Sequence, residues 1–424
     1  MKQSLYIGMV VSMQLVASLF IQLLVIRVIG VGAETDAYIA AQAVPSVLGA
    51  IIITALQSVW LPRFSVLSND LTAWRLEQAI AQGQAALLGG GLFLLIAFSA
   101  PVWLSLLFPG FDHAQQQDAL NYSYVLLMST AFNTQSALLT VALRSRDRFI
   151  AAEVIALLGT LFSLVVLYFV LPVWGLLAAV WVTLLRSILV YITQLNLAKW
   201  PPISLRKGML FKETWLLMRP LLFGTSIYKT SPLVDRYWAS LAPSGAITIL
   251  TFAQIIINSL ASILTRALGL PLTPSIARLV NESEYIEVRK IYLTLIIKMS
   301  FIILFFVSIF LLMKSQIVGL LSQVASIDYE TSRELWLLTI LLFGHLFAAV
   351  TGAVLVSVFY ALNNTRTPVV IGIVGFLFGL FLKWFLFTSY SLTGLAIATS
   401  TYFIFNIVLF LIVLESKYFR IKVR

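Results

Sequence analysis

The chain is a succession of long apolar runs separated by short polar breaks. A helix needs roughly 20 apolar residues to cross the hydrocarbon core of a bilayer, and runs of this length recur from one end of the chain to the other. The pattern therefore predicts an all-α polytopic membrane protein with about twelve transmembrane helices. We expect these helices at residues 5–29, 37–61, 84–108, 119–143, 149–171, 173–198, 213–242, 246–272, 291–313, 335–361, 368–388 and 392–414.

Composition supports this class. Of the 424 residues, 60% are hydrophobic and only 11% are charged, a balance that a soluble domain could not bury. The first apolar run, Leu5 to Ile29, is longer than the apolar region of a typical signal peptide, so we interpret it as a retained first helix. The chain has no cysteine, which excludes disulfides and thiol chemistry.

The net charge of +11 is distributed unevenly between the connections. Lysine and arginine collect in the second, fourth, sixth, eighth and tenth connections and in the C-terminal tail, while the opposite connections contain few cations. Cytoplasmic loops of membrane proteins carry an excess of these residues. The alternation predicts that both termini and the even-numbered connections lie in the cytoplasm.

A basic linker near the middle of the chain, residues 199–212, predicts a division into an N-terminal half (1–198) and a C-terminal half (213–424). Sparse identities relate the halves at a shift of 212 residues: Ala41-Gln42 matches Ala253-Gln254, Leu56 matches Leu268, and Pro62 matches Pro274. Each half begins in the cytoplasm and has an even number of spans. The halves are therefore expected to be parallel six-helix bundles around a central cavity.

No catalytic set is present. The two histidines, His113 and His345, are far apart, and no metalloprotease, P-loop or serine hydrolase motif occurs. We therefore expect no enzymatic activity, no cofactor and no metal site. Transport would be driven by ions, membrane potential or a substrate gradient rather than by ATP hydrolysis in this chain.

The informative residues are charges inside the predicted spans. Charges at membrane depth are costly and usually face a cavity or a partner. Seven of the eight are cations, which suits an anionic ligand such as a phosphate or pyrophosphate and suits a cationic drug poorly. The eight are Arg27, Arg186, Arg219, Lys229, Asp235, Arg236, Arg266 and Lys383.

The predicted depth of these cations in the membrane divides them into two groups. Arg27, Arg219 and Lys383 lie near predicted helix ends, where a long side chain can reach the membrane interface instead of a cavity. Arg186 and Arg266, with Lys229, lie deeper, and we expect these three to face a cavity.

The helix predicted at 213–242 contains Pro220, Gly224 and Pro232, with Lys229 and Asp235 nearby. Proline removes a backbone donor and bends a helix. Interrupted helices mark binding sites and moving parts in transporters, although a simple packing kink is the alternative.

Asp36 lies at the mouth of the second helix, either as a gating or coupling carboxylate or as a helix N-cap before the apolar run from Ala37. The repeat-related Gln42 and Gln254 join Asp36, Asp235 and Pro232 as gating or coupling candidates.

Four segments, in order along the chain, carry a resemblance to a known family: Gly30–Tyr38 with Val44-Pro45, Asp235–Leu241 with Pro243–Ile247, Leu270–Ser275, and Phe359–Leu362 with Thr365–Val369. They resemble motifs of the MurJ/MviN flippase family. The resemblance implies a fold of the multidrug/oligosaccharidyl-lipid/polysaccharide exporter superfamily. It also implies flipping of a polyprenyl-pyrophosphate-linked sugar across the bacterial cytoplasmic membrane by alternating access, with membrane lipids and a glycan polymerase or synthesis complex as candidate partners.

The chain departs from the family where that family carries its functional cations. Those positions hold Ile21-Gln22, Gly49-Ala50 and Gln254-Ile255 here. The resemblance therefore indicates a divergent member that carries either a surface-polysaccharide repeat unit or peptidoglycan lipid II.

Our leading hypothesis is a flippase in which five cations bind the anionic head group: Arg27, Arg186, Lys229, Arg236 and Arg266. A cation-coupled multidrug or metabolite exporter on the same fold is the first alternative, and it would depend on Asp36 or Asp235. A non-transporting scaffold in an envelope-synthesis complex is the second, and it would tolerate loss of every buried charge.

Overall fold

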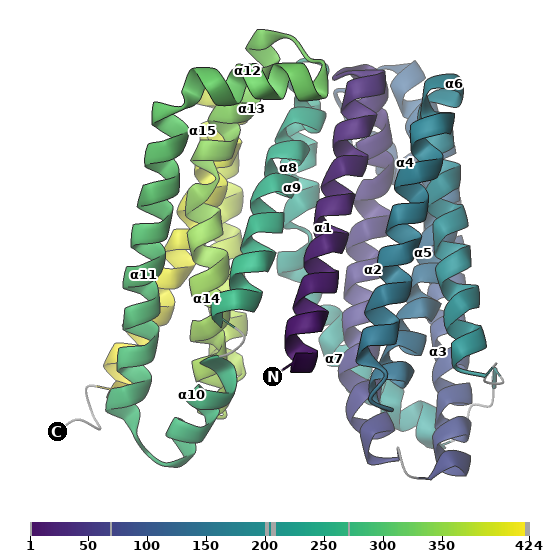
Figure 1. Ribbon diagram of the computed structural model, residues 1–424, viewed down its shortest axis with the longest axis vertical. Coiled ribbons are helices and arrows are strands. Elements are labelled where there is room, and N and C mark those ends of the chain that lie inside the picture. Colours follow the sequence, from purple (N-terminus) through teal and green to yellow (C-terminus); the bar gives the residue numbers. More distant parts are fainter. Residues whose placement is uncertain (1, 68–69, 200–202, 205–208, 270–271, 420–424) are drawn as a thin grey trace. The chain divides into compact units, whose positions relative to one another are not determined.

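Every regular element in the described residues, which are 2–67, 70–199, 203–204, 209–269 and 272–419, is a helix in the computed structural model (Figure 1). Within these ranges, nine helical stretches are long and apolar enough to cross a membrane. The predicted class, an all-α polytopic membrane protein, is confirmed. Most of the basic linker lies outside the described residues.

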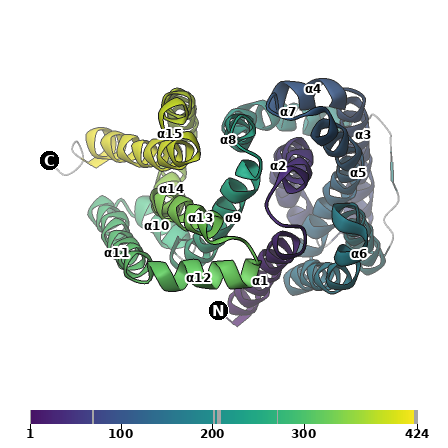
Figure 2. The ribbon, with the colours of Figure 1, turned by 90° about the horizontal axis from the view of Figure 1, so that it is seen from above.

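The chain forms two compact units, residues 1–245 and 246–424. Unit 1 contains eight α-helices, and its helix α5 packs against α2, α3 and α6, while α1 packs on α6 and α7 on α2 (Figure 2). The contact of α7 with α2 explains why residues 209–245 join the N-terminal helices. The helices are α1 (Lys2–Ile29), α2 (Ala33–Val66), α3 (Leu71–Phe98), α4 (Ala100–Leu107), α5 (His113–Arg144), α6 (Phe149–Leu197), α7 (Met209–Lys229) and α8 (Ser231–Ser240).

In unit 2, α14 packs against α9, α10, α11 and α15. Buried Tyr292, Val350 and Phe359 belong to the apolar core of this unit. The elements are α9 (Ala246–Leu264), the π-helix η1 (Thr265–Gly269), α10 (Leu272–Asn281), α11 (Tyr285–Leu312), α12 (Lys314–Ala325), α13 (Tyr329–Leu341), α14 (Phe343–Ala361), α15 (Arg366–Leu414) and the π-helix η2 (Glu415–Phe419).

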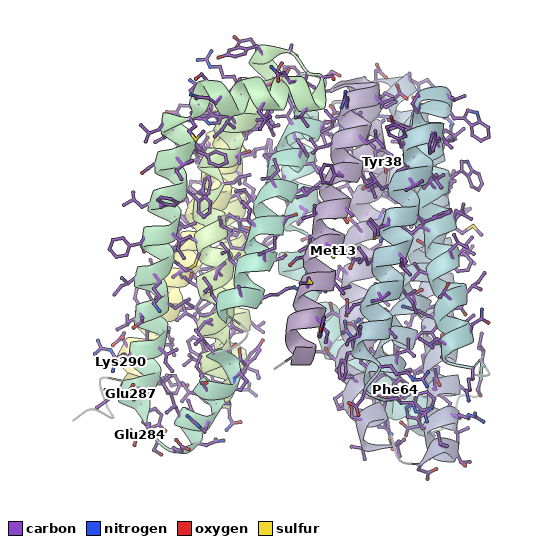
Figure 3. All side chains as sticks on the ribbon, in the orientation of Figure 1. Met13, Tyr38, Phe64, Glu284, Glu287 and Lys290 are labelled. Carbon is purple, nitrogen blue, oxygen red and sulfur yellow. The ribbon has the colours of Figure 1, made fainter. Side chains whose placement is uncertain are left out.

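Three aromatic rings pack together near the C-terminal end of α2. The Phe64 ring lies 5.4 Å from the Trp60 ring and 6.1 Å from the Trp74 ring of α3. Phe64 and Tyr38 mark opposite ends of α2 (Figure 3). Trp74 explains why α3 begins at Leu71 rather than at the predicted residue 84: the first turns of α3 bury one face against neighbouring helices, although their sequence is too polar to resemble a membrane span.

Aspartate side chains cap the N-termini of three helices, α3, α5 and α13. Asp70 accepts hydrogen bonds from Thr72 N and Ala73 N, and Asp112 accepts one from Gln115 N. Asp328 accepts from the backbone N and the hydroxyl of Thr331, and these bonds hold the pKa of Asp328 below its usual value. Such caps satisfy backbone N–H groups that the first turn of a helix leaves free.

Two helices, α6 and α15, are each 49 residues long. A straight helix of this length would extend about 74 Å, more than twice the ~30 Å hydrocarbon core. Each helix has a break with positive φ, at Gly175 (φ 57°, ψ −150°) and at Ser391 (φ 52°, ψ −133°). The two arms of each helix then fold back and pack closely against one another. A Cβ on Gly159 would lie 2.5 Å from Val190 Cγ2 of the other arm, and a Cβ on Gly379 would lie 2.9 Å from the Tyr402 ring.

Each of these helices therefore accounts for two crossings. With the interrupted pair α7–α8, the described residues give about twelve crossings, as predicted. Three short α-helices of the described residues, α4, α10 and α12, were not expected as separate elements. The equal lengths of α6 and α15 and the equivalent places of their breaks support an internal repeat. The boundary of that repeat at 199–212 and the cavity between the halves stay predictions.

The break in α15 places a serine in a backbone conformation that favours glycine, at a cost of about 1–3 kcal/mol. We expect Ser391→Gly to raise the apparent melting temperature by roughly 2 °C, measured by thermal unfolding of the purified protein in detergent. Ser389→Gly, two residues away in the helical part of α15, is the matched control and should lower it slightly. A lower melting temperature for Ser391→Gly would contradict the strain argument.

Candidate functional site

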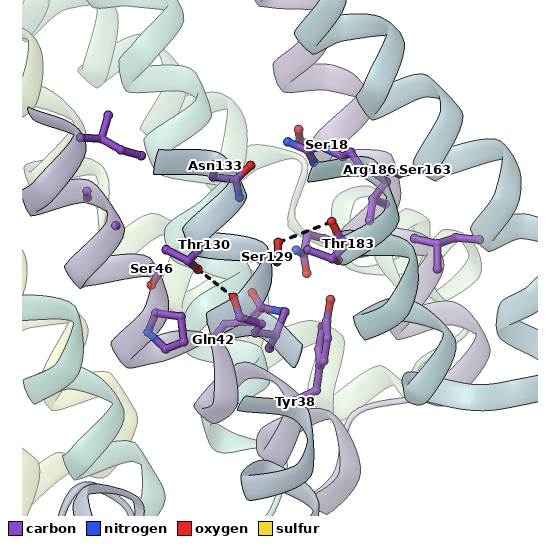
Figure 4. A pocket seen from close by; sticks show the side chains of 18 residues that line it. Ser18, Tyr38, Gln42, Ser46, Ser129, Thr130, Asn133, Ser163, Thr183 and Arg186 are labelled. Carbon is purple, nitrogen blue, oxygen red and sulfur yellow. Dashed lines mark hydrogen bonds between the residues drawn. The ribbon is translucent and has the colours of Figure 1, made fainter. Parts of the chain in front are cut away.

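Unit 1 contains a cavity of about 490 Å³ between α1, α2, α5 and α6 (Figure 4). This volume lies within the range of about 300–1,000 Å³ that is typical of small-ligand pockets. We call it the unit 1 pocket. Its lining comprises Ser18, Ile21, Gln22, Tyr38, Gln42, Pro45, Ser46, Gly49, Ala50, Ile53, Leu126, Ser129, Thr130, Asn133, Ser163, Leu167, Thr183 and Arg186.

Helical periodicity brings these residues together. The contributions of α2 recur every three or four positions from Tyr38 to Ile53, which places them on one face of the helix. Gly49 permits a close approach of α2 to α5, because a Cβ at this position would lie 2.7 Å from Thr130 Cγ2. Small residues allow helices in membranes to pack in this way.

The lining is polar although it lies among apolar spans. Eleven of the eighteen side chains carry polar groups, and Arg186 is the charged one among these described residues. Several hydroxyls donate their proton to a carbonyl one turn earlier in their own helix. These bonds run from Ser18 to Gln14 O (2.9 Å), from Thr130 to Leu126 O (2.8 Å), from Ser163 to Gly159 O (3.0 Å) and from Thr183 to Ala179 O (2.7 Å).

Arg186 extends from the second arm of α6 and is half-buried. Its Cγ lies 3.5 Å from where a Gly159 Cβ would stand, so the glycine leaves room for its stem. Tyr38, Gln42 and Thr183 line the same pocket as Arg186. The ion pairs of the described chain do not include Arg186. A cation at membrane depth without a carboxylate partner favours an anionic ligand.

Lys229 supplies a second cation at the rim of the unit 1 pocket. It is the last residue of α7, and its Nζ donates to Ala50 O (3.0 Å) and to Thr54 Oγ1 (2.6 Å) on α2. Ala50 itself lines the pocket. An ammonium group has three N–H donors, so α2 occupies two and the third can meet a ligand. The predicted interruption of this helix is confirmed, because α7 ends at Lys229 and α8 begins at Ser231.

Asp36 joins two turns that are far apart in sequence. Its Oδ2 accepts a hydrogen bond of 2.7 Å from Gly245 N, and its side chain is buried. Gly245 has φ +93° and packs so closely on Val31 that a Cβ would clash. The alternative interpretation of Asp36 as the N-cap of its own helix is wrong, since α2 begins three residues earlier and is capped by Gly32 with Thr35. Its gating role stays a prediction.

The remaining candidates of unit 1 lie outside the pocket lining. Arg27 is exposed in the last turn of α1, and Pro232 is exposed in the first turn of α8. Asp235 is buried on α8, next to the half-buried Arg236, of which two guanidinium nitrogens lack a hydrogen-bond partner in the described chain. The side chains of Pro220 and Gly224 lie outside the described residues.

Three candidates belong to unit 2. Arg266 is exposed in η1, and Gln254 is half-buried on α9. Lys383, for which we expected a path to the membrane interface, is instead only 2% exposed, with its Nζ 5.2 Å from the centre of the Tyr402 ring. The cause is packing: Gly379 on the first arm of α15 allows Tyr402 of the second arm to lie close by, where its ring faces the ammonium group.

Sequence reasoning missed most of the neutral pocket residues, such as Tyr38, Asn133 and Thr183. Their signal was a polar position every three or four residues on otherwise apolar helices. Gln22 and Gly49-Ala50, which occupy the places of the family's cations, do line the unit 1 pocket. Here those places are neutral, and Arg186 and Lys229 supply the positive charge from α6 and α7.

A polytopic helical bundle with a polar, positively charged pocket among its spans belongs to the class of membrane transporters. The chain is a member of the MurJ lipid II flippase family, because the sequence model described as lipid II flippase MurJ matches residues 25–422. This membership and the fold confirm the family indicated by the four motifs.

Solved structures share the fold. A lipid II flippase MurJ in an inward closed conformation has a TM-score of 0.84 at 16% identity, covering 97% of this chain and 87% of its own. An inward-facing multidrug resistance MATE family transporter has a TM-score of 0.73 at 16% identity, with 93% of both chains covered. A MOP superfamily transporter from Pyrococcus furiosus has a TM-score of 0.67 at 16% identity, covering 96% and 94%. Among curated protein sequences, no significant match is found.

The hydrogen bond between Asp36 and Gly245 can be tested by stability. Asp36→Ala leaves a buried backbone N–H without its acceptor, at a cost of about 1–3 kcal/mol. We expect a clearly lower melting temperature in detergent. Glu34→Ala, in the same turn but exposed, is the matched control and should leave the melting temperature unchanged. Equal melting temperatures for the two variants would argue against this role.

Proposed function

We propose that this protein is a flippase that moves a polyprenyl-pyrophosphate-linked glycan across the bacterial cytoplasmic membrane by alternating access. The observation that carries the proposal is the unit 1 pocket, with Arg186 in its wall, Lys229 on its rim and no carboxylate among its described lining residues. Family membership supports a lipid-linked substrate of this kind.

The chemistry follows from desolvation. A head group that crosses a membrane loses water, and its negative charge needs fixed cations and hydrogen-bond donors in exchange. Lys229 can supply such a donor to a pyrophosphate while it remains bound to α2. No covalent bond changes during flipping, so the protein acts by binding and release, without a cofactor.

The interrupted helix α7–α8 is the part of unit 1 best suited to move. Lys229 stands at the interruption and ties α7 to α2 through Ala50 and Thr54. A pyrophosphate bound at the third N–H would draw the ammonium group toward itself and weaken this tie, and so would couple binding to a change of helix position. Asp235 and Pro232 on α8 are our candidates for the same coupling.

The orientation of the protein is also a proposal. Ion pairs between Arg63 and Glu77 and between Arg144 and Glu153 lie at one end of unit 1, where the basic connections lie. The excess of lysine and arginine supports a cytoplasmic position for this end and for both termini. A surface-polysaccharide repeat unit and lipid II are both candidate cargoes, and a glycan synthesis complex is a candidate partner.

A cation-coupled drug or metabolite exporter is the competing function, because MATE transporters share the fold. Such a protein would need a carboxylate near its ligand. The lining of the unit 1 pocket offers none among the residues described, and Asp36 is bound to Gly245 N. These observations favour the flippase.

The double substitution Lys229→Ala and Arg266→Ala tests the proposal. Lys229→Ala removes a cation worth about 1.5–3 kcal/mol in a charge-assisted hydrogen bond, and Arg266→Ala removes a second cation that the sequence predicts to bind the head group, so transport should fall at least about tenfold. The measurement is translocation of a polyprenyl-pyrophosphate-linked sugar in proteoliposomes, at matched protein levels.

The control is the double substitution Arg278→Ala and Lys290→Ala, which removes two exposed cations of unit 2 that pair with the nearby Glu282 and Glu287. Its translocation rate should equal that of the unmodified protein. Unchanged translocation by the Lys229/Arg266 variant would refute the assignment, and dye efflux driven by a proton or sodium gradient would favour the exporter.

A further inference from the structure

The unit 1 pocket contains many more neutral polar groups than a pyrophosphate would use. Besides Arg186, ten side chains contribute hydroxyls, amides and one phenol. We propose that this pocket binds a sugar ring that carries a carboxylate, and that Arg186 pairs with that carboxylate. This inference rests on the proposed function and names its substrate class: a lipid-linked glycan with an acidic sugar.

The hydrogen-bond acceptors in the lining of the unit 1 pocket favour a sugar over a phosphate. Because the hydroxyl protons of Ser18, Thr130, Ser163 and Thr183 are donated to backbone carbonyls, their oxygens meet the pocket mainly as acceptors. Sugar hydroxyls can donate to such acceptors. Phosphate oxygens only accept, so a wall rich in acceptors would repel them.

The amide side chains complete this recognition. Gln22, Gln42 and Asn133 come from α1, α2 and α5 and each offers a donor and an acceptor. Amides and hydroxyls that converge from several helices match the alternating donors and acceptors around a sugar ring. These groups are neutral, so the single positive charge of the lining is at Arg186.

One guanidinium group matches one carboxylate. Its planar fork pairs with both carboxylate oxygens, and the pair is strengthened where water is excluded. The ion pairs recorded for the described residues leave Arg186 without a carboxylate. A pocket with this charge is therefore complementary to a sugar acid with one negative charge.

Lys229 and Arg186 reach the unit 1 pocket from different helices. The ammonium group of Lys229, at the end of α7, is bound to Ala50 and Thr54 on α2. Arg186 extends from the second arm of α6, one turn after the pocket residue Thr183. The two cations can thus contact separate parts of one head group, with the pyrophosphate at Lys229 and the sugar acid at Arg186.

The test compares two ligands that differ in one group: undecaprenyl pyrophosphate linked to glucuronic acid and the same lipid linked to glucose. Binding to the purified full-length protein in nanodiscs should be at least tenfold tighter for the glucuronic acid lipid. Arg186→Gln should reduce this preference to about twofold or less and leave glucose-lipid affinity nearly unchanged. Arg148→Gln, an exposed arginine at the start of the same helix, is the matched control and should retain the full preference.

Two further variants separate the sugar from the pyrophosphate. Lys229→Gln should weaken binding of both glycolipids equally. Asn133→Leu should weaken both, yet leave binding of undecaprenyl pyrophosphate alone unchanged. If Arg186→Gln proves unstable, Arg186→Lys keeps the charge without the planar fork and should show an intermediate preference for the acidic lipid.

The outcomes that would overturn the inference are distinct from failure of the proposed function. If Arg186→Gln weakens both glycolipids equally, Arg186 contacts the shared pyrophosphate and the acidic-sugar assignment is wrong. Equal or tighter binding of the glucose lipid, or of lipid II, to the unmodified protein would also overturn it. If the folded protein binds none of the polyprenyl pyrophosphates, the proposed function itself fails.

Discussion

The high cost of a polar or charged group without a partner at membrane depth governs this structure. Helices satisfy the backbone within each span, which is why every regular element of the described chain is helical. Side chains follow the same constraint. Serine and threonine hydroxyls bond to carbonyls of their own helix, Lys383 lies over the Tyr402 ring, and Asp36 receives the N–H of Gly245. Arg186 differs from these groups, because the ion pairs of the described residues give it no carboxylate partner.

Close backbone approach is the second physical requirement, and glycine meets it. Gly49 lets α2 approach α5 beside the pocket, while Gly159 and Gly379 let the arms of α6 and α15 fold back on themselves. Gly175 and Ser391 turn the chain at equivalent places in the two long helices. The same packing that closes the apolar interfaces thus positions the pocket-lining face of α6, from which both Arg186 and Thr183 extend.

These features give the family's scaffold a different distribution of charge. The positions at which the resemblance implies cations hold Gln22 and Gly49-Ala50, and the side chains around them in the pocket are mainly neutral hydrogen-bonding groups. Positive charge now enters from α6 and α7 through Arg186 and Lys229. In the function proposed above, this distribution of charge would hold a pyrophosphate at the rim of the pocket and leave its hydroxyls, amides and Arg186 to bind the sugar.

The sequence alone determined the class, the approximate number of spans, the interruption near Pro232 and the family, because apolar length, proline content and motif order are properties of a linear chain. It also indicated Arg186, which lines the unit 1 pocket, and Lys229, which lies at its rim. Only the tertiary structure decided which groups meet. Asp36 binds a backbone group 209 residues away, Lys383 turns toward Tyr402 instead of the interface, and four helices bring their polar faces to one pocket. Such contacts depend on how distant segments pack, and no local pattern in the chain encodes that packing.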